Sequence, residues 1–197
     1  MPWLEPVTLC SARVNLEPLD KSHLADLNES ARDGELWKLW YTTVPSPENM
    51  AEEIERRQRL KAEGSMLPFA VIDKSLGSAV GMTSFMHVDA VNHRLEIGST
   101  WYRGSVQRTA LNTHCKRLLL GHAFEVLECI AVEFRTHFMN RRSRGAIERL
   151  GAKLDGVLRQ HQRTADGTLR DTCVYSIIAS EWPAVRSNLE WQMHRPR

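Results

Sequence analysis

A chain of 197 residues is long enough to bury the core of one ordinary domain, and we expect a single domain over residues 1–197. The 26 Lys and Arg residues exceed the 24 Asp and Glu residues by only two, which argues against a general electrostatic attraction to nucleic acid or to an anionic membrane. The four cysteines are scattered without a CxxC pair, as is typical of a reduced protein. The opening residues MPWLEPVTLC carry no basic region followed by an apolar run, so we expect a soluble, cytoplasmic protein.

The first part of the chain predicts one strand followed by two helices. Apolar alternation over residues 12–19 indicates a strand, and Asp20 is placed to cap a helix after it. Residues 34–47 are rich in Trp and Tyr and contain two prolines, which favours an ordered loop with short helical turns. The charged segment 48–63 predicts a surface helix that ends at Gly64.

Three β-rich segments come next. Residues 68–73 and 79–86 have the spacing of a hairpin, and residues 94–102 form a further strand. Gly98 interrupts that last strand, where glycine usually marks a bulge or a close approach of another backbone. We therefore expect an antiparallel meander with an irregularity near Gly98.

The second half of the chain alternates helices and strands. Helical spacing over residues 111–127 is followed by strand alternation over 130–138, a helix over 140–150, and two strands near 152–160 and 172–179. A strand, helix, strand sequence requires a right-handed crossover and a locally parallel pair. The predicted fold is α/β (α+β), a mixed and mostly antiparallel sheet flanked by about four helices.

The segment 102–114 joins a strand to the first turn of a helix. Such a junction binds anions, because the first N–H groups of a helix lack partners and its dipole is positive there. Small Ala110 would let a ligand approach the backbone, and Asn112 or Thr113 would cap the helix. A pyrophosphate would fit this loop; the alternative is a plain turn with a good cap.

Two stretches resemble the GNAT acetyltransferase superfamily. LEIGSTWY followed by QRTALNT is similar to the family's glutamate-containing fourth strand and its Q/R-x-x-G-x-G/A pyrophosphate loop. NRRSRGAIERLGAKLDGVLR is similar to its fourth helix and next strand, in the form of the RimJ/RimL-like branch that modifies ribosomal proteins and N-termini. The close resemblance spans residues 79–179, and the order of elements extends it to nearly the whole chain.

The chain departs from the family pattern at three positions. Ala110 stands where glycine is usual and Asn112 where glycine or alanine is usual, so a requirement for positive φ at Ala110 would weaken coenzyme binding. Ile147 occupies the place where many relatives carry a tyrosine that protonates the departing thiolate. Another acid must then serve, or none.

The resemblance implies acetyl-coenzyme A as cosubstrate, a sheet splayed at its parallel pair, and direct attack of a primary amine on the thioester. Backbone N–H groups of the bulged strand near residues 98–100 would bond the developing oxyanion. The cofactor-binding residues that it implies are Thr100, Trp101, Tyr102, Gln107, Arg108, Thr109, Ala110, Leu111, Asn112, Thr113, Asn140 and Ser143.

Two side chains are candidates for catalysis. Glu96 could be a general base or orient the amine, or it could be an exposed strand glutamate paired with an arginine. Ser143 could bond the coenzyme sulfur and return a proton, or it could be a favourable small residue in a helix that Asn140 caps.

The acceptor is inferred from the pKa of amines. An α-amino group titrates near about 8 and lysine near about 10.4, so a terminal amine needs less help from a base at neutral pH. Because the sequence places no obvious His-Asp pair near the site, we favour a protein or peptide N-terminus over lysine, with a small amine as the other option. Trp37, Trp40 and Tyr41 would line the acceptor site, or pack into the core of their loop.

Metal and nucleic acid are not expected as partners. The histidines and cysteines have neither zinc-finger nor HExxH spacing, so we predict no metal. The arginines at 135, 141, 142 and 144 could bind RNA, attract the phosphates of coenzyme A, or form a solvated helix face.

Two further questions stay open from sequence. The rival to an enzyme is a catalytically degenerate coenzyme-binding module or a regulatory interaction protein, which the departures at 110, 112 and 147 suggest. Exposed sheet edges and a long C-terminal tail over residues 181–197, with Trp182 and Trp191, are compatible with a homodimer.

Overall fold

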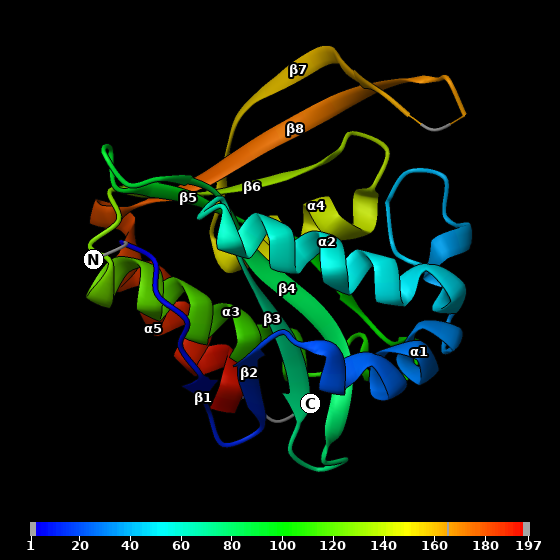
Figure 1. Cartoon of the computed structure of the whole chain (residues 1–197). Coiled ribbons are helices and arrows are strands. Elements are labelled where there is room, and N and C mark those ends of the chain that lie inside the picture. Colours follow the sequence, from blue (N-terminus) through cyan, green and yellow to red (C-terminus); the bar gives the residue numbers. More distant parts are fainter. Residues whose placement is uncertain (1–2, 165, 195–197) are drawn as a thin grey trace.

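The computed structural model describes residues 3–164 and 166–194, which form one eight-stranded sheet with helices on both faces (Figure 1). The strand order is β1-β2-β3-β4-β5-β6-β8-β7. The strands are β1 (Leu9–Cys10), β2 (Val14–Pro18), β3 (Met66–Asp73), β4 (Ser78–Asp89), β5 (Arg94–Tyr102), β6 (Ala131–His137), β7 (Lys153–Arg163) and β8 (Leu169–Ile178). Every neighbouring pair is antiparallel except β5 and β6, which confirms the predicted mixed sheet.

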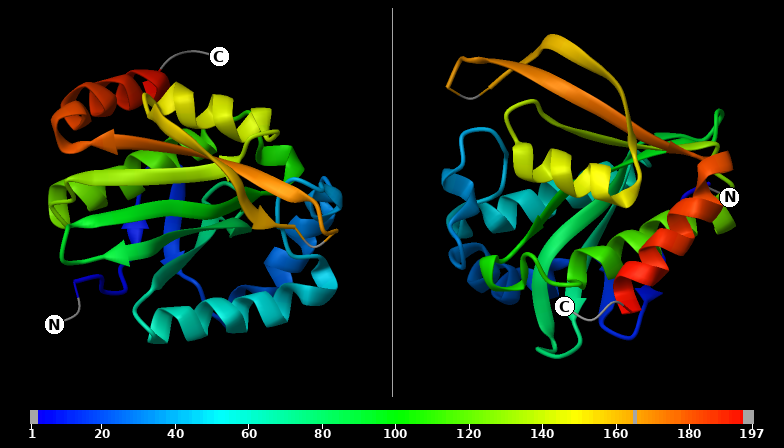
Figure 2. Two further views of the ribbon diagram at one scale, coloured as in Figure 1. Left: turned by 90° about the horizontal axis from the view of Figure 1, so that it is seen from above. Right: turned by 180° about the vertical axis from the view of Figure 1, so that it is seen from behind.

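The helices cover the sheet in two groups. They are α1 (Leu24–Arg32), α2 (Met50–Ala62), α3 (Leu111–Gly121), α4 (Arg141–Leu150) and α5 (Trp182–His194). Helices α1 and α2 lie on one face, whereas α3 and α5 lie on the other, as the views from above and from behind show (Figure 2). The larger core cluster joins α3, α4 and α5 to the sheet, and the smaller one joins α1 and α2 to its other face.

Several predicted helix ends are confirmed by their local chemistry. The side chain of Asp20 accepts from the N–H of Ser22 and caps a short 3-10 turn that leads into α1. Asn140 accepts from the N–H of Ser143 at the start of α4. Gly151 ends α4 with φ of 103°, a left-handed conformation that glycine adopts without strain.

Helix α3 and the C-terminal segment differ from the prediction. The α-helix expected to run to residue 127 ends at Gly121 and continues as a π-helical turn over His122–Val126. The predicted tail over residues 181–197 is largely the helix α5, whose residues Trp182, Val185 and Leu189 are buried; residues 195–197 lie outside the described residues. The short strand β1 and helix α5 are thus additions to the predicted elements, and α5 brings the α-helices of the described residues to five.

The last two strands form a long hairpin. Strands β7 and β8 pair antiparallel from Lys153 with Ser176 to Arg163 with Leu169, and Figure 1 shows their connected end reaching beyond the helices. The predicted turn at Asp166-Gly167 lies between them, with Gly167 at φ of 84°. Only β8 of this pair is bonded to the rest of the sheet, so β7 is an edge.

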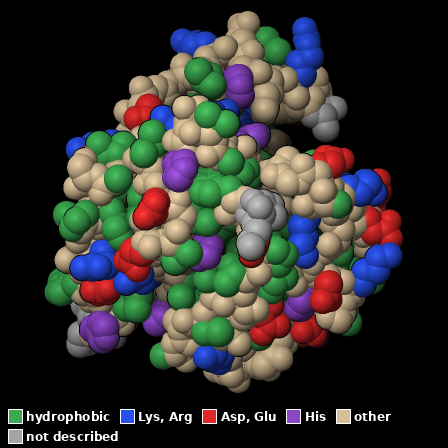
Figure 3. Space-filling view, turned by 60° about the vertical axis from the view of Figure 1, so that its left-hand side comes forward, with side chains coloured by type: hydrophobic (Ala, Val, Ile, Leu, Met, Phe, Trp, Pro, Cys, Tyr) green, Lys and Arg blue, Asp and Glu red, His purple; other side chains and the backbone are tan. Residues whose placement is uncertain are grey.

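None of the helices in the described part of the chain is long and apolar enough to cross a membrane. On the face that Figure 3 shows, acidic and basic side chains lie beside one another, in line with the near balance of charge.

Candidate active site

The sheet opens where its parallel pair ends. Strands β5 and β6 are paired only from Arg94 with Ala131 to Glu96 with Glu133. Beyond these pairs the two strands diverge, so that β6 and the β7–β8 hairpin lead away from β3 to β5 (Figure 1). We call these two unpaired segments, residues 97–102 of β5 and 134–137 of β6, the notch. Its walls are strand edges that do not pair with each other, which is a place for an extended ligand to add main-chain hydrogen bonds.

A bulge lies in the wall of the notch, at the predicted position. Ser84 of β4 faces Gly98 of β5 and Met82 faces Trp101, so β5 carries one extra residue in this interval. Ser99 takes up the irregularity with φ of 48°, an uncommon value for a residue with a side chain. Gly98 lies beside it, and a Cβ there would lie 2.6 Å from both Glu96 Oε1 and Met86 Sδ, so a larger residue would make these two side chains move.

A buried arginine fixes this bulge from α2. Arg57 is 2% exposed, and its guanidinium donates to the Ser99 carbonyl at 3.3 Å and to Ser84 Oγ at 3.0 Å. Its Nε donates to Glu53 Oε1 at 2.7 Å, so the buried charge has a carboxylate partner. The sequence pattern gave no reason to single out Arg57, which looks like one of many charged residues of a surface helix.

The loop between β5 and α3 is held mainly by its own side chains. Gln107 Nε2 donates to the Tyr102 carbonyl at 2.9 Å, and Thr109 Oγ1 donates to the Val106 carbonyl at 2.7 Å. Thr109 Oγ1 also accepts from the N–H of Leu111 at 3.2 Å. These bonds place the first turn of α3 at the end of β5 that carries the notch.

The predicted caps of α3 are wrong. Asn112 lies inside the first turn and accepts from the Tyr102 hydroxyl at 3.0 Å, while Thr113 is buried at 2% exposure. Position N-cap is Ala110, whose φ of −71° is right-handed, so alanine is unstrained there. The positive φ of the loop, 60°, belongs to Arg108 instead. The departure from glycine at Ala110 therefore carries no backbone penalty.

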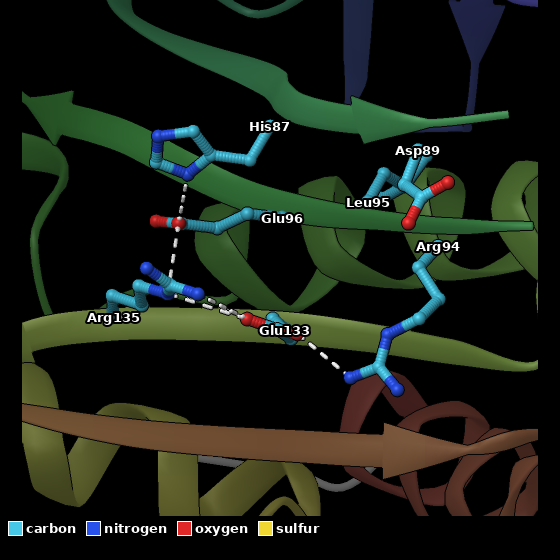
Figure 4. A pocket seen from close by; sticks show the side chains of 7 residues that line it. All are labelled: His87, Asp89, Arg94, Leu95, Glu96, Glu133 and Arg135. Atoms are coloured by element: carbon cyan, nitrogen blue, oxygen red, sulfur yellow. Dashed lines mark hydrogen bonds and ion pairs between the residues drawn. The ribbon is translucent and has the colours of Figure 1, made fainter. Parts of the chain in front are cut away.

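Glu96 lies on the α2 side of the sheet beside a cavity of about 200 Å³. It is 4% exposed, and His87 Nδ1 lies 2.8 Å from its Oε2. Arg135 Nε lies 3.6 Å from the same oxygen (Figure 4). Burial raises the pKa of Glu96 above its ordinary value, while the hydrogen bond and charge of His87 and the charge of Arg135 act against that rise. The alternative for Glu96 was an exposed glutamate paired with an arginine. Glu96 does lie near Arg135, but it is buried and not exposed.

His87 is a residue of this site that the sequence pattern did not single out. The side chain of His87 is 61% exposed and joins Glu96 to solvent, which is the arrangement that a proton relay needs. The sequence showed no obvious His-Asp pair near the site, but the structure brings His87 and Glu96 together as a histidine-carboxylate pair. The rest of the cavity is lined by Asp89, Leu95 and an ion-paired cluster in which Glu133 bonds both Arg94 and Arg135.

The predicted aromatic residues separate into two environments. Trp37 packs against the smaller core cluster, as the core alternative stated. Trp40 is 56% exposed, and its ring lies 5.6 Å from that of Tyr41 and 5.2 Å from that of His137, both edge to face. His137 ends β6, so Trp40 reaches the second wall of the notch from the loop between α1 and α2.

The start of α4 faces the same strand. The side chain of Asn140 is engaged with the N–H of Ser143 at 3.0 Å, and Ile147 belongs to the larger core cluster. Of the arginines considered for RNA, Arg135 bonds Glu133, and Arg144 donates to the Tyr175 hydroxyl at 2.9 Å. The guanidinium of Arg141 lies 5.1 Å from the centre of the Phe138 ring. Among the described residues no group of three or more His, Cys, Asp or Glu side chains is arranged to hold a metal ion.

Comparisons with known proteins agree with this geometry. The model of the acetyltransferase (GNAT) domain family matches residues 13–153. YdaF of Bacillus subtilis (strain 168), named provisionally as a ribosomal N-acetyltransferase, is 31% identical over 175 residues, covering 85% of this chain and 90% of that protein.

Solved structures show the same architecture. A GCN5-related N-acetyltransferase from Brucella melitensis has a TM-score of 0.87 and 28% identity, with 98% of this chain and 87% of that chain covered. RimL, a ribosomal L7/L12 alpha-N-protein acetyltransferase solved with coenzyme A, has a TM-score of 0.74 at 19% identity, with 87% of this chain and 98% of that chain covered, which shows the fold. The family match over most of the chain and the notch at a bulged strand lead to one conclusion: this chain belongs to the GNAT family of N-acetyltransferases.

Proposed function

We propose that this protein transfers the acetyl group of acetyl-coenzyme A to a primary amine in a ternary complex, with a protein or peptide N-terminus as the favoured acceptor. The observation that carries this proposal is the notch, whose bulged wall at Ser99 is fixed by Arg57. The family uses acetyl-coenzyme A, which supplies an activated thioester when bound. The unpaired strand edges fit an extended arm with amide groups, and the adjoining N-terminus of α3 fits an anion.

The binding roles follow the walls of the notch. Main-chain groups of Thr100, Trp101 and Tyr102 would bond the pantetheine arm from β5. Backbone N–H groups within residues 107–113 would receive the pyrophosphate, since this segment leads into the first turn of α3. Asn140 and Ser143, at the first turn of α4, would contact the arm and its sulfur from the β6 side.

Catalysis would rest on oriented donors and one relay. N–H groups of the bulge near residues 98–100 would stabilise negative charge on the carbonyl oxygen as the amine attacks. Glu96 with His87 would orient the amine or take its proton, because the carboxylate is buried and its pKa is raised while the histidine reaches solvent. Ser143 is the candidate for returning a proton to the sulfur.

The choice of acceptor depends on the pKa of the amine. The presence of the His87–Glu96 pair removes one reason for excluding lysine, but the lower pKa of an α-amino group still favours an N-terminus. The exposed rings of Trp40 and Tyr41, close to His137, would contact the side chain that follows the amine. A small amine is the second acceptor class to test.

The decisive experiment is an acceptor screen of peptides and small amines with detection of the released thiol. Turnover with N-terminal amines supports the proposal, and turnover with small amines alone would assign the other class. If no amine releases coenzyme A above hydrolysis while acetyl-coenzyme A still raises the melting temperature, the coenzyme-binding module is correct instead. If calorimetry detects no binding of coenzyme A or acetyl-coenzyme A, both the acetyltransferase and the coenzyme-binding module are refuted.

The pH dependence separates the roles of enzyme and substrate. We expect kcat/KM for a peptide to follow the pKa of its own amine, with a modest loss in the variant Glu96→Gln. A steep dependence on a group of the enzyme, abolished by Glu96→Gln, would show a dedicated base. Cytoplasmic location and a homodimer stay proposals, which fractionation of cells and sedimentation equilibrium test.

A further inference from the structure

A lysine of α3 is buried against the notch. Lys116 is 6% exposed, and among the buried described residues it and Arg57 are the two cations. Its Nζ lies 3.2 Å from Thr100 Oγ1 on β5 and 6.0 Å from the centre of the Phe134 ring on β6. These strands are no longer paired beyond Glu96, so the amine of Lys116 sits between the two diverging walls, on the face opposite α2.

The bonds that Lys116 makes within the chain do not account for its burial. No carboxylate of the described residues lies within ion-pair distance of Nζ, whereas buried Arg57 has Glu53. The single hydroxyl that Nζ contacts, Thr100 Oγ1, is shared with Thr83 Oγ1 at 2.8 Å and lies 3.3 Å from the Gly98 carbonyl. An ammonium group has three donors, and burying it without acceptors is costly. The site therefore calls for an acceptor from outside the chain.

The neighbouring groups add little charge. The thiol of Cys115 on the same helix is buried, and burial raises its pKa to about 12, so it is neutral near pH 7. The nearby phenol of Tyr102 is also neutral, because burial raises its pKa. Thr100 on β5 and the Phe134 ring on β6 lie against Nζ, and neither side chain titrates. Burial lowers the pKa of Lys116 itself to about 8, which leaves most of it protonated at pH 7.

We propose that Lys116 is a catalytic residue whose ammonium donates a hydrogen bond to the carbonyl oxygen of the thioester that lies beside Thr100. This inference rests on the proposed function. As the bond from the amine nitrogen to the carbonyl carbon forms, the electron pair of the C=O double bond moves to oxygen, and Lys116 stabilises that charge. When C=O re-forms, the C–S bond breaks and sulfur leaves with its electrons. Lys116 keeps its proton throughout, and the proton that the acceptor amine loses passes to the Glu96–His87 pair.

The test measures binding as well as turnover. Calorimetry compares coenzyme A, which has no acyl carbonyl, with acetonyl-coenzyme A. In the latter a methylene group separates the sulfur from the carbonyl carbon, so there is no thioester bond and the group cannot be transferred. The variant Lys116→Met keeps length and apolar volume without the charge, and Lys21→Met makes the same change at a lysine that is 76% exposed. Melting temperatures of both variants establish that they fold.

We expect wild-type protein and Lys21→Met to bind acetonyl-coenzyme A about tenfold more tightly than coenzyme A, and Lys116→Met to lose this preference, since a hydrogen bond from a charged donor has about that strength. With an active acceptor, kcat should fall about a hundredfold in Lys116→Met, as for the loss of one oxyanion donor. In wild-type protein kcat/KM should fall on the alkaline side of its pH profile, above about pH 8, where Lys116 of the free enzyme loses its proton, and the variant Lys116→Arg should lack this fall.

Three results would overturn the inference. Retention of the preference in Lys116→Met would show that the lysine does not touch the acyl carbonyl. An equal loss of affinity for both ligands would place it on an amide of the pantetheine arm. An acetyl adduct on Lys116 that forms at the rate of turnover would make it an acceptor. Failure of the wild-type protein to bind either ligand is a separate outcome, because it refutes the proposed function first. If Lys116→Met does not fold, the pH profile of Lys116→Arg decides alone.

Discussion

The variant Arg57→Met tests the claim that a buried arginine fixes the bulge. Removing the guanidinium takes away its bonds to Glu53, Ser84 and Ser99 at 2.7, 3.0 and 3.3 Å. Loss of one partner from a buried ion pair costs about 3–5 kcal/mol, because the remaining charge stays buried. Glu53 keeps Arg56, whose Nε lies 2.7 Å away, so we expect the lower end. The free energy of unfolding should fall by about 3 kcal/mol.

Urea unfolding measures this change, and Arg56→Met is the matched control. Arg56 bonds the same carboxylate, but its side chain is 46% exposed, so its removal should cost less than about 1 kcal/mol. If Arg57→Met loses no more stability than Arg56→Met, the guanidinium does not hold the bulge and the reasoning is refuted. A change in the slope of free energy against urea would instead point to an altered unfolded state.

The same variant should affect the site. Arg57 holds the carbonyl of Ser99, whose φ of 48° depends on its surroundings. We expect KM for acetyl-coenzyme A to rise in Arg57→Met and to stay unchanged in Arg56→Met. If folded Arg57→Met has the same KM for acetyl-coenzyme A as the wild-type protein, the bulge keeps its shape without the arginine.

Three other variants test separate statements. Burial raises the pKa of Glu96, so the folded state binds its proton more tightly than the unfolded chain, and the ionised carboxylate costs stability above the folded pKa. The free energy of unfolding of Glu96→Gln relative to wild type should therefore be higher at pH 7.5 than at pH 4, and equal differences at both pH values would contradict this. Asn140→Ala should lower the free energy of unfolding, measured in urea, by about 1 kcal/mol, because the N–H of Ser143 loses its capping bond to Asn140. No change would show that this bond does not contribute to stability. Ala110→Gly should cost about 0.5–1 kcal/mol without tightening coenzyme A binding, because φ is already −71°; a large gain in affinity by calorimetry would show that the bound loop needs glycine.

Helix ends and the irregular strand could be predicted because their signals are local. Asp20 and Asn140 bond N–H groups two or three residues away, and Gly151 supplies a left-handed φ by itself. Gly98 in an otherwise β-rich run marked the bulge for the same reason. The fold class then followed from the order of elements and from the resemblance of two short stretches to a family.

The polar pairs of the site could not be predicted, since they depend on contacts between strands and helices. Met86 lies opposite Glu96, so regular alternation would point His87 to the other face of the sheet. The positive φ of His87, 48°, turns its ring towards Glu96 instead. Lys116 follows buried Cys115 on α3, and helical spacing alone would place a lysine there in solvent. Its burial depends on the divergence of β5 and β6.

The missed helix shows a limit of a different kind. The segment predicted as a tail over residues 181–197 forms helix α5 from Trp182 to His194. Its residues Val185 and Leu189 are buried in the cluster that also contains Val14 and Leu16 of β2. Trp182, Val185 and Leu189 have the spacing of one helix face, so the helix itself could have been predicted, whereas its contact with β2 could not.

The short parallel pairing of β5 with β6 divides the sheet into two parts. The first part is β1 to β5 and the second is β6 to β8, and three backbone residue pairs of the β5–β6 ladder join them. Helix α5 follows β8, the last strand of the second part, and packs against α3. Helix α3 in turn lies on β1 and β2 of the first part. Helix α5 therefore links the two parts of the sheet through α3, and we expect a substitution that weakens the packing of α5 on α3 to disturb the notch without touching any residue that lines it.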